Sequence, residues 1–185
     1  MKKILSFVLL LAIGSFAWAD IEQGDSDHAV LFGFGYASSD DDENRSDDSY
    51  WPLELVYDGG YCLTENWVLG VSVGSDIGWD TGGADSLALF AGPMVKYNFF
   101  PQTNVIPFVG FQADFWYQQT DYDTRFSRSQ HEDYGLMLGP LGGIKFFLDE
   151  ATSLMFQYEL RFFAGDIGDI IDYQHVFMVG FGFNF

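Results

Sequence analysis

The chain ends in Tyr173-Gln174-His175-Val176-Phe177-Met178-Val179-Gly180-Phe181-Gly182-Phe183-Asn184-Phe185, and this stretch decides the fold class. Apart from His175, every second residue from Tyr173 to Phe185 is large and apolar or aromatic, while the residues between are mostly small or polar. A period of two over this length predicts a β-strand with one apolar face. Such a strand would be a sticky edge in water, whereas in a closed barrel it pairs with the first strand.

Seven earlier segments alternate in the same way. With the last one, the predicted strands are 28–38, 50–63, 67–79, 86–99, 105–119, 133–147, 152–164 and 173–185. The segments between them are alternately longer and acidic (39–49, 80–85, 120–132, 165–172) or short (64–66, 100–104, 148–151). Short turns at one rim and longer loops at the other are typical of an outer-membrane barrel. The sequence therefore predicts an all-β fold, an eight-stranded antiparallel up-and-down transmembrane β-barrel.

The first residues predict export. Lys2 and Lys3, an apolar run and Ala17-Trp18-Ala19 form a signal peptide at 1–19, which leaves a periplasmic lead-in at 20–27 and the barrel at 28–185. Removing 1–19 takes away two lysines and no acids, so the remaining chain has 6 basic and 27 acidic residues and a formal charge of −21. This acidity argues against a nucleic-acid partner. Cys62 is the one cysteine, so no internal disulfide is expected.

The face opposite the apolar one decides between a membrane barrel and a soluble, lipocalin-like barrel. It carries small residues and few charges, as a narrow interior requires, rather than a charge at most positions, as a solvated surface would. Aromatic residues gather near both ends of the strands, which fits two interfacial girdles. We expect a lumen network in which each base lies near an acid, formed by Glu54, Asp58, Asp76, Lys96, Asp114, Lys145, Glu159 and Arg161.

A weak internal repeat lies within two of the predicted strands. Gly92-Pro93 and Gly139-Pro140 each precede a Lys-aromatic pair and a turn. Proline cannot donate to a strand ladder, so we expect a bulge or an edge-like distortion at Pro93 and Pro140.

Signal peptide, eight strands, glycine-rich lumen and aromatic last strand together resemble the small outer-membrane β-barrel proteins of OmpA, OmpX and OmpW type. The resemblance implies residence in the outer membrane of a Gram-negative cell envelope. It also implies that Phe181, Phe183 and Phe185 act as the signal read by the barrel-assembly machinery.

Catalysis finds little support in the sequence. Outer-membrane lipid A deacylases that resemble this fold use a His-x-Ser pair, and none of His28, His131 or His175 has a serine two residues later. The segment around His131, with Glu132, Asp133, Ser127 and Ser129, only loosely echoes other barrel enzymes. We expect no enzyme activity and no cofactor, and we place His175 at the outer rim as an interfacial residue.

The segment 40–48 is the densest run of charge. Its carboxylates suit Ca²⁺ or Mg²⁺, and Asp40, Asp42, Asp47 and Asp48 are the candidate metal ligands, although the spacing is not that of an EF-hand. The alternative is a solvated acidic loop. We expect a monomeric, non-enzymatic, structural or surface-interaction protein that contacts outer-membrane lipid and lipopolysaccharide, with a narrow channel for small solutes or a lipid-modifying enzyme as alternatives.

Overall fold

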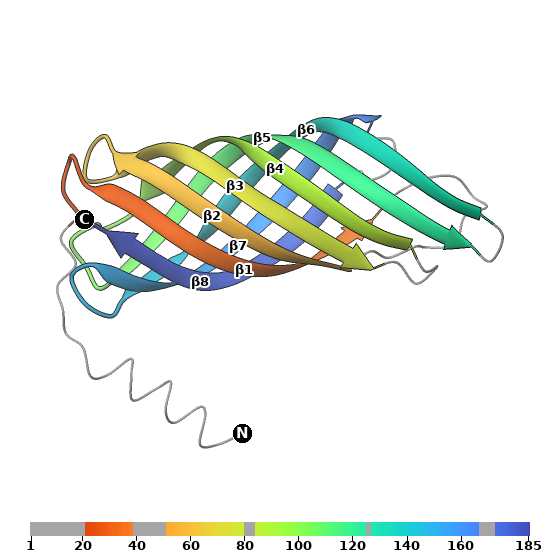
Figure 1. Cartoon of the computed structure of the whole chain (residues 1–185). Coiled ribbons are helices and arrows are strands. Elements are labelled where there is room, and N and C mark those ends of the chain that lie inside the picture. The colour runs from red at the N-terminus through yellow and green to blue at the C-terminus, as the bar shows by residue number, and fades with distance from the viewer. Residues whose placement is uncertain (1–20, 39–50, 80–83, 125–126, 167–172) are drawn as a thin grey trace, which may run out of the picture.

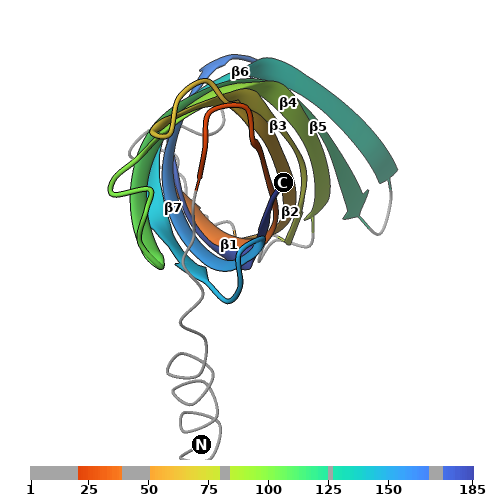
Figure 2. The ribbon, with the colours of Figure 1, turned by 90° about the vertical axis from the view of Figure 1, so that its left-hand side faces the viewer.

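A computed structural model of the protein describes residues 21–38, 51–79, 84–124, 127–166 and 173–185. Within these residues, eight antiparallel strands pair in chain order and close into a barrel through β1 and β8 (Figures 1 and 2). The strands are β1 (Ser26–Ser38), β2 (Trp51–Cys62), β3 (Trp67–Trp79), β4 (Ala84–Asn98), β5 (Val105–Thr124), β6 (Ser127–Phe147), β7 (Thr152–Gly165) and β8 (Tyr173–Asn184). The predicted eight-stranded antiparallel barrel is confirmed.

The hairpin of β5 and β6 corrects one boundary. The interpretation of 120–132 as a loop is wrong for most of that range, because β5 continues to Thr124 and β6 begins at Ser127. Figure 1 shows these two strands extending past the others at the end opposite the carboxyl terminus. A hairpin beyond the bilayer needs no apolar face, so its sequence is polar on both faces and carries no alternation signal.

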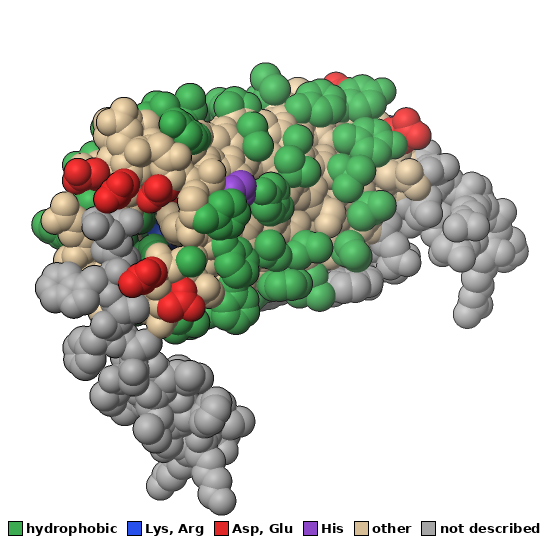
Figure 3. All heavy atoms as spheres, turned by 60° about the vertical axis from the view of Figure 1, so that its left-hand side comes forward, with side chains coloured by type: hydrophobic (Ala, Val, Ile, Leu, Met, Phe, Trp, Pro, Cys, Tyr) green, Lys and Arg blue, Asp and Glu red, His purple; other side chains and the backbone are tan. Residues whose placement is uncertain are grey.

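The wall of the barrel turns its apolar face outward and its charges inward. Phe32, Leu55 and Phe156 are 58%, 47% and 47% exposed, whereas Glu54, Lys96 and Arg161 are at most 4% exposed. Figure 3 shows hydrophobic side chains spread over the wall, with acidic side chains gathered at its ends. This arrangement excludes the soluble barrel, in which the apolar face would be inside. No helix among the described residues is long and apolar enough to cross a membrane.

Both Gly-Pro sites interrupt the hydrogen-bonded ladder. Between β4 and β5 the register passes from Ala91↔Phe115 to Met94↔Gln112 without pairing the residues between, and β6 and β7 show the same break at Gly139-Pro140. The register is unchanged across each break, so no residue is inserted. The distortion at the prolines is therefore a local opening between strands rather than a bulge.

The residues before β1 fold over the mouth of the barrel at the end where the short turns lie. Gly24, at φ 104°, donates its N–H to the Cys62 carbonyl at 2.9 Å, and Cys62 donates to the Asp25 carbonyl at 2.8 Å. Ile21 is thereby buried, at 1% exposed, among inward side chains that include Cys62, Ile106 and Phe147. Figure 2 shows this segment running across the opening of the barrel. β1 itself begins at Ser26, two residues earlier than predicted.

Candidate functional site

The candidate site is the polar network inside the lumen, and its first part lies near the short-turn end. Lys96 Nζ donates to Asp58 Oδ2 at 2.6 Å, and Lys145 Nζ donates to Asp27 Oδ2 at 2.6 Å. All four side chains are at most 5% exposed. The centroid of the Phe108 ring lies 5.4 Å from Lys96 Nζ and 5.7 Å from Lys145 Nζ. Each lysine is therefore paired with its own carboxylate, and both ammonium groups contact the same aromatic ring.

The second part of the network is centred on Arg161. Its Nη1 donates to Glu54 Oε1 at 2.9 Å, its Nε donates to Glu159 Oε2 at 2.7 Å, and its Nη2 lies 2.8 Å from Glu54 Oε2. Glu159 also accepts from Gln112 at 2.9 Å and from Gln157 at 2.8 Å. Because β2 and β7 are not neighbours in the barrel, the contact of Arg161 with Glu54 crosses the lumen. One guanidinium thus holds two carboxylates from separate parts of the wall.

Aromatic rings complete this central layer. The Phe90 and Trp116 rings stack with centroids 5.0 Å apart and planes 3° apart, and Phe163 meets Trp116 edge-on at 5.1 Å. The Arg161 guanidinium carbon lies 5.0 Å from the Phe90 centroid and 5.9 Å from the Trp116 centroid. The lumen is therefore filled by large side chains as well as the small ones expected from the sequence.

Two further inward acids lie outside these ion pairs. Asp76 accepts a long hydrogen bond of 3.4 Å from Gln174, which in turn accepts one of 3.3 Å from Arg161. Asp114 is fully buried beside the opening at Gly92-Pro93, and neither of its carboxylate oxygens has a hydrogen-bond partner among the described residues. Among the described residues, the structure thus brings Glu54, Asp58, Lys96, Lys145, Glu159 and Arg161 of the expected lumen network into ion pairs, links Asp76 to them through Gln174, and leaves Asp114 without a hydrogen bond.

Sequence reasoning missed several members of the network. Asp27 was assigned to the lead-in because the alternation becomes clear only after it, yet it is the partner of Lys145. Gln112, Gln157 and Gln174 are uncharged, so a prediction based on ionisable groups does not include them. Their inward positions in the period of two were the signal that could have found them.

The residues of the predicted assembly signal lie on the outer wall where β1 and β8 pair. Phe181, Phe183 and Phe185 are 50%, 39% and 75% exposed. Ser26 donates its N–H to the Phe185 carbonyl at 2.7 Å and accepts from the Phe185 N–H at 3.2 Å, and the His28 ring stacks on Phe185 at 5.0 Å. The last residue is therefore part of the junction between the two ends of the chain.

The candidate metal ligands Asp40, Asp42, Asp47 and Asp48 lie outside the described residues. No group of three or more metal-ligating side chains occurs in the part of the chain that the structure describes.

The three histidines lie beside tyrosine or aspartate side chains in the described part of the chain. His28 and His175 share hydrogen bonds of 2.7 Å with Tyr57 and 2.6 Å with Tyr158 on the outer wall. His131, which is 66% exposed, lies 3.0 Å from Asp133. The side chains of Ser127 and Ser129 lie outside the described residues.

A closed barrel with an apolar outer wall and internal ion pairs defines an integral β-barrel protein of a membrane. The chain matches the family model described as outer membrane protein beta-barrel domain over residues 5–185, and it belongs to that family. Its location is the cell outer membrane, and its fold is that of the small eight-stranded outer-membrane barrels. No match was found among curated proteins.

Several solved structures share the fold. Neisserial surface protein A superimposes with a TM-score of 0.63 at 14% identity, covering 88% of this chain and 96% of that one. The attachment invasion locus protein Ail of Yersinia pestis gives 0.54 at 13% identity, covering 88% and 99%, and OprG of Pseudomonas aeruginosa gives 0.53 at 16%, covering 89% and 97%. Identities this low show a shared fold alone.

Proposed function

We propose that the protein is a non-enzymatic surface protein of the outer membrane, in which the barrel anchors the outward loops and those loops meet partners. The observation that carries this proposal is the ion pair of Arg161 with Glu54 across the lumen, together with Lys96–Asp58 and Lys145–Asp27. A lumen occupied by paired charges and stacked rings leaves little room for a ligand. The working surface is then the outer end of the molecule.

The charge of that end indicates what it would bind. Six acids and one arginine fall within 40–48, and the other long connections add further acids. An acidic surface attracts cationic partners and divalent cations. Asp40, Asp42, Asp47 and Asp48 would supply the oxygen ligands through which Ca²⁺ or Mg²⁺ links the loop to anionic lipopolysaccharide. We further propose a monomer that is inserted by the barrel-assembly machinery.

The test compares cells carrying the wild type with cells carrying a variant in which those four aspartates are asparagines. Retention of the cells is measured on surfaces coated with a cationic or an anionic polymer, at several salt concentrations. The proposal expects stronger, salt-sensitive retention of wild-type cells on the cationic surface and loss of that difference in the variant. Equal retention on both surfaces would contradict it, and surface levels of the two proteins are matched by heat-modifiable gel mobility.

The second candidate is a narrow channel. It is favoured by buried polar atoms on Asn98, Asn184 and Asp114 that have no hydrogen-bond partner among the described residues, because such atoms would require water inside the lumen. Among the described residues seven acids and three bases are buried in the wall, so a channel would prefer cations. A steady cation current in a planar bilayer would favour this candidate, and a new lipid A product by mass spectrometry would favour the third, a lipid-modifying enzyme.

A further inference from the structure

The outer wall carries a groove that arises from the strand register. One row of outward residues crosses four adjacent strands as register partners: Phe34 on β1, Phe177 on β8, Tyr158 on β7 and Gly142 on β6. Gly142 has no side chain, so the row of side chains ends there and the groove is open at that end.

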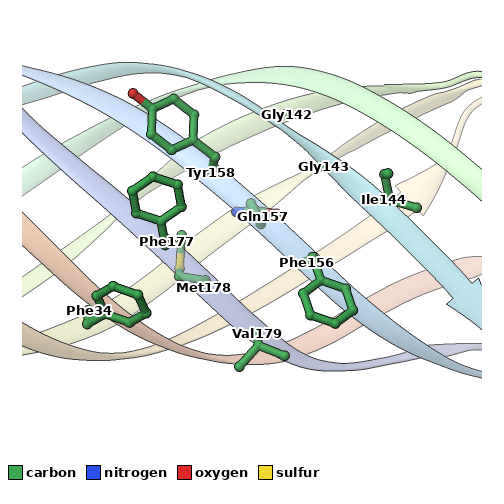
Figure 4. Close-up of a pocket in the computed structure, with 10 residues that line it drawn as sticks. All are labelled: Phe34, Gly142, Gly143, Ile144, Phe156, Gln157, Tyr158, Phe177, Met178 and Val179. Carbon is green, nitrogen blue, oxygen red and sulfur yellow. The ribbon is translucent and has the colours of Figure 1, made fainter. Parts of the chain in front are cut away.

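A second row runs parallel to the first, two residues along each strand. It consists of Val179, Phe156 and Ile144, which are also register partners. Between the rows lie residues whose side chains point into the lumen, so backbone near Met178, Gln157 and Gly143 forms the floor. Figure 4 shows the two rows of side chains on either side of this trough, which has a volume of about 460 Å³.

The polar group nearest the groove is turned out of it. Tyr158 uses its hydroxyl in the 2.6 Å hydrogen bond with His175, which lies on the side of the first row away from the groove. Figure 4 shows the hydroxyl pointing away from the other lining residues. The Tyr158 ring also packs against Phe177, with centroids 4.9 Å apart. The trough therefore offers only apolar side-chain surface, held in place by ring contacts and one hydrogen bond.

We propose that this groove binds one acyl chain of lipopolysaccharide from the outer leaflet. The groove is continuous with the wall that faces the bilayer, so a lipid chain covers it. Neighbouring strands lie about 4.8 Å apart, so a groove that crosses four strands is about 14 Å long and accommodates a single acyl chain lying along it.

The inclination of the groove assigns the leaflet. Strands in such barrels tilt by about 35–45°, so a trough perpendicular to them descends obliquely through the membrane. Its upper end is at Phe34, four residues from the outer end of β1, and its lower end is at Gly142, five residues from the periplasmic end of β6. A chain entering at Phe34 comes from the outer leaflet, which lipopolysaccharide occupies. This inference does not depend on the proposed role of the loops.

The proposal is tested with substitutions that fill the groove. A Cβ at Gly142 would lie 3.5 Å from the Phe108 carbonyl oxygen and 3.8 Å from Val109, both ordinary contacts, so Gly142→Leu places its bulk in the trough without strain. Ile144→Phe fills the groove from the opposite row and keeps the glycine. Ala91→Leu is the matched control, because Ala91 faces outward on β4, away from the groove. Heat-modifiable gel mobility establishes that each variant is folded.

Each protein is folded in detergent with equal amounts of lipopolysaccharide and phosphatidylethanolamine, and the retained lipid is counted by native mass spectrometry. We expect one lipopolysaccharide on the wild type and on Ala91→Leu. Retention should fall about tenfold in Gly142→Leu and Ile144→Phe, which corresponds to about two methylenes losing their burial. Equal retention by all variants would show that the lipid does not bind in the groove. Retention of phosphatidylethanolamine in place of lipopolysaccharide would show that the proposed ligand is wrong.

Discussion

Replacing Arg161 with alanine should cost the barrel a large part of its stability. The guanidinium contacts Glu54 and Glu159 at 2.6 to 2.9 Å, and all three side chains are at most 4% exposed. Removing one partner of a buried ion pair costs about 3–5 kcal/mol, because a charge is left uncompensated. Here two carboxylates are stranded, and the guanidinium contact with the Phe90 ring is lost as well. We expect a loss of about 4 kcal/mol in the free energy of unfolding.

Urea unfolding of the protein in lipid vesicles measures this loss. Tryptophan fluorescence is a suitable signal, because Trp116 stacks in the same layer as Arg161. The triple variant Arg161→Met, Glu54→Gln, Glu159→Gln separates stranded charge from lost packing. It should recover most of the stability, since it removes the buried acids together with the base. A loss of less than about 1 kcal/mol in the free energy of unfolding of Arg161→Ala would refute this reasoning. It would show that water hydrates the two carboxylates once the guanidinium is removed. A triple variant no more stable than Arg161→Ala would refute it too.

Four further outcomes are expected. Lys145→Met should lower stability by about 3 kcal/mol in the same urea assay by stranding Asp27, whereas Lys145→Arg should not. Phe185→Asp should reduce the yield of heat-modifiable barrel in the outer membrane, because it places a charge at the chain junction; an unchanged yield would count against an assembly role. Calorimetry of the detergent-folded protein should show Ca²⁺ binding at millimolar concentration, abolished when the four candidate aspartates are asparagines. The wild type should give no steady single-channel current, and a reproducible current would promote the channel.

The direction of each lumen side chain could be predicted from sequence, but its partner could not. A period of two assigns Arg161 and Glu54 to the same side of the wall without any knowledge of pairing. Their contact joins residues 107 positions apart and depends on how the barrel closes. The pairing of Arg161 with Glu159 is different, because residues two apart on one strand always share a face. The sequence alone could therefore predict side-chain partners on the same strand, but not partners on distant strands.

The predicted strand boundaries are wrong where the strands extend beyond the bilayer. Inside the membrane one face must be apolar, and the alternation marks each strand. Beyond it, β5 and β6 pair from Tyr117↔Tyr134 to Thr124↔Ser127 with no such requirement. The same loss of signal hid Asp27, which lies inside the barrel but follows a polar segment. Both errors have one cause, because hydrophobic periodicity reports the environment of a strand and not its hydrogen bonds.

The groove on the wall shows a third limit. Its first row crosses β1, β8, β7 and β6, and that row reaches β1 only because closure sets Phe34 opposite Phe177. A shift of two residues in that one register would leave every side chain on its own face and the barrel equally apolar outside. It would, however, move Phe34 out of line with Phe177, Tyr158 and Gly142. The outward face is thus determined by composition, whereas a shaped site on it is determined by register, and the glycine in the row becomes informative only once the register is known.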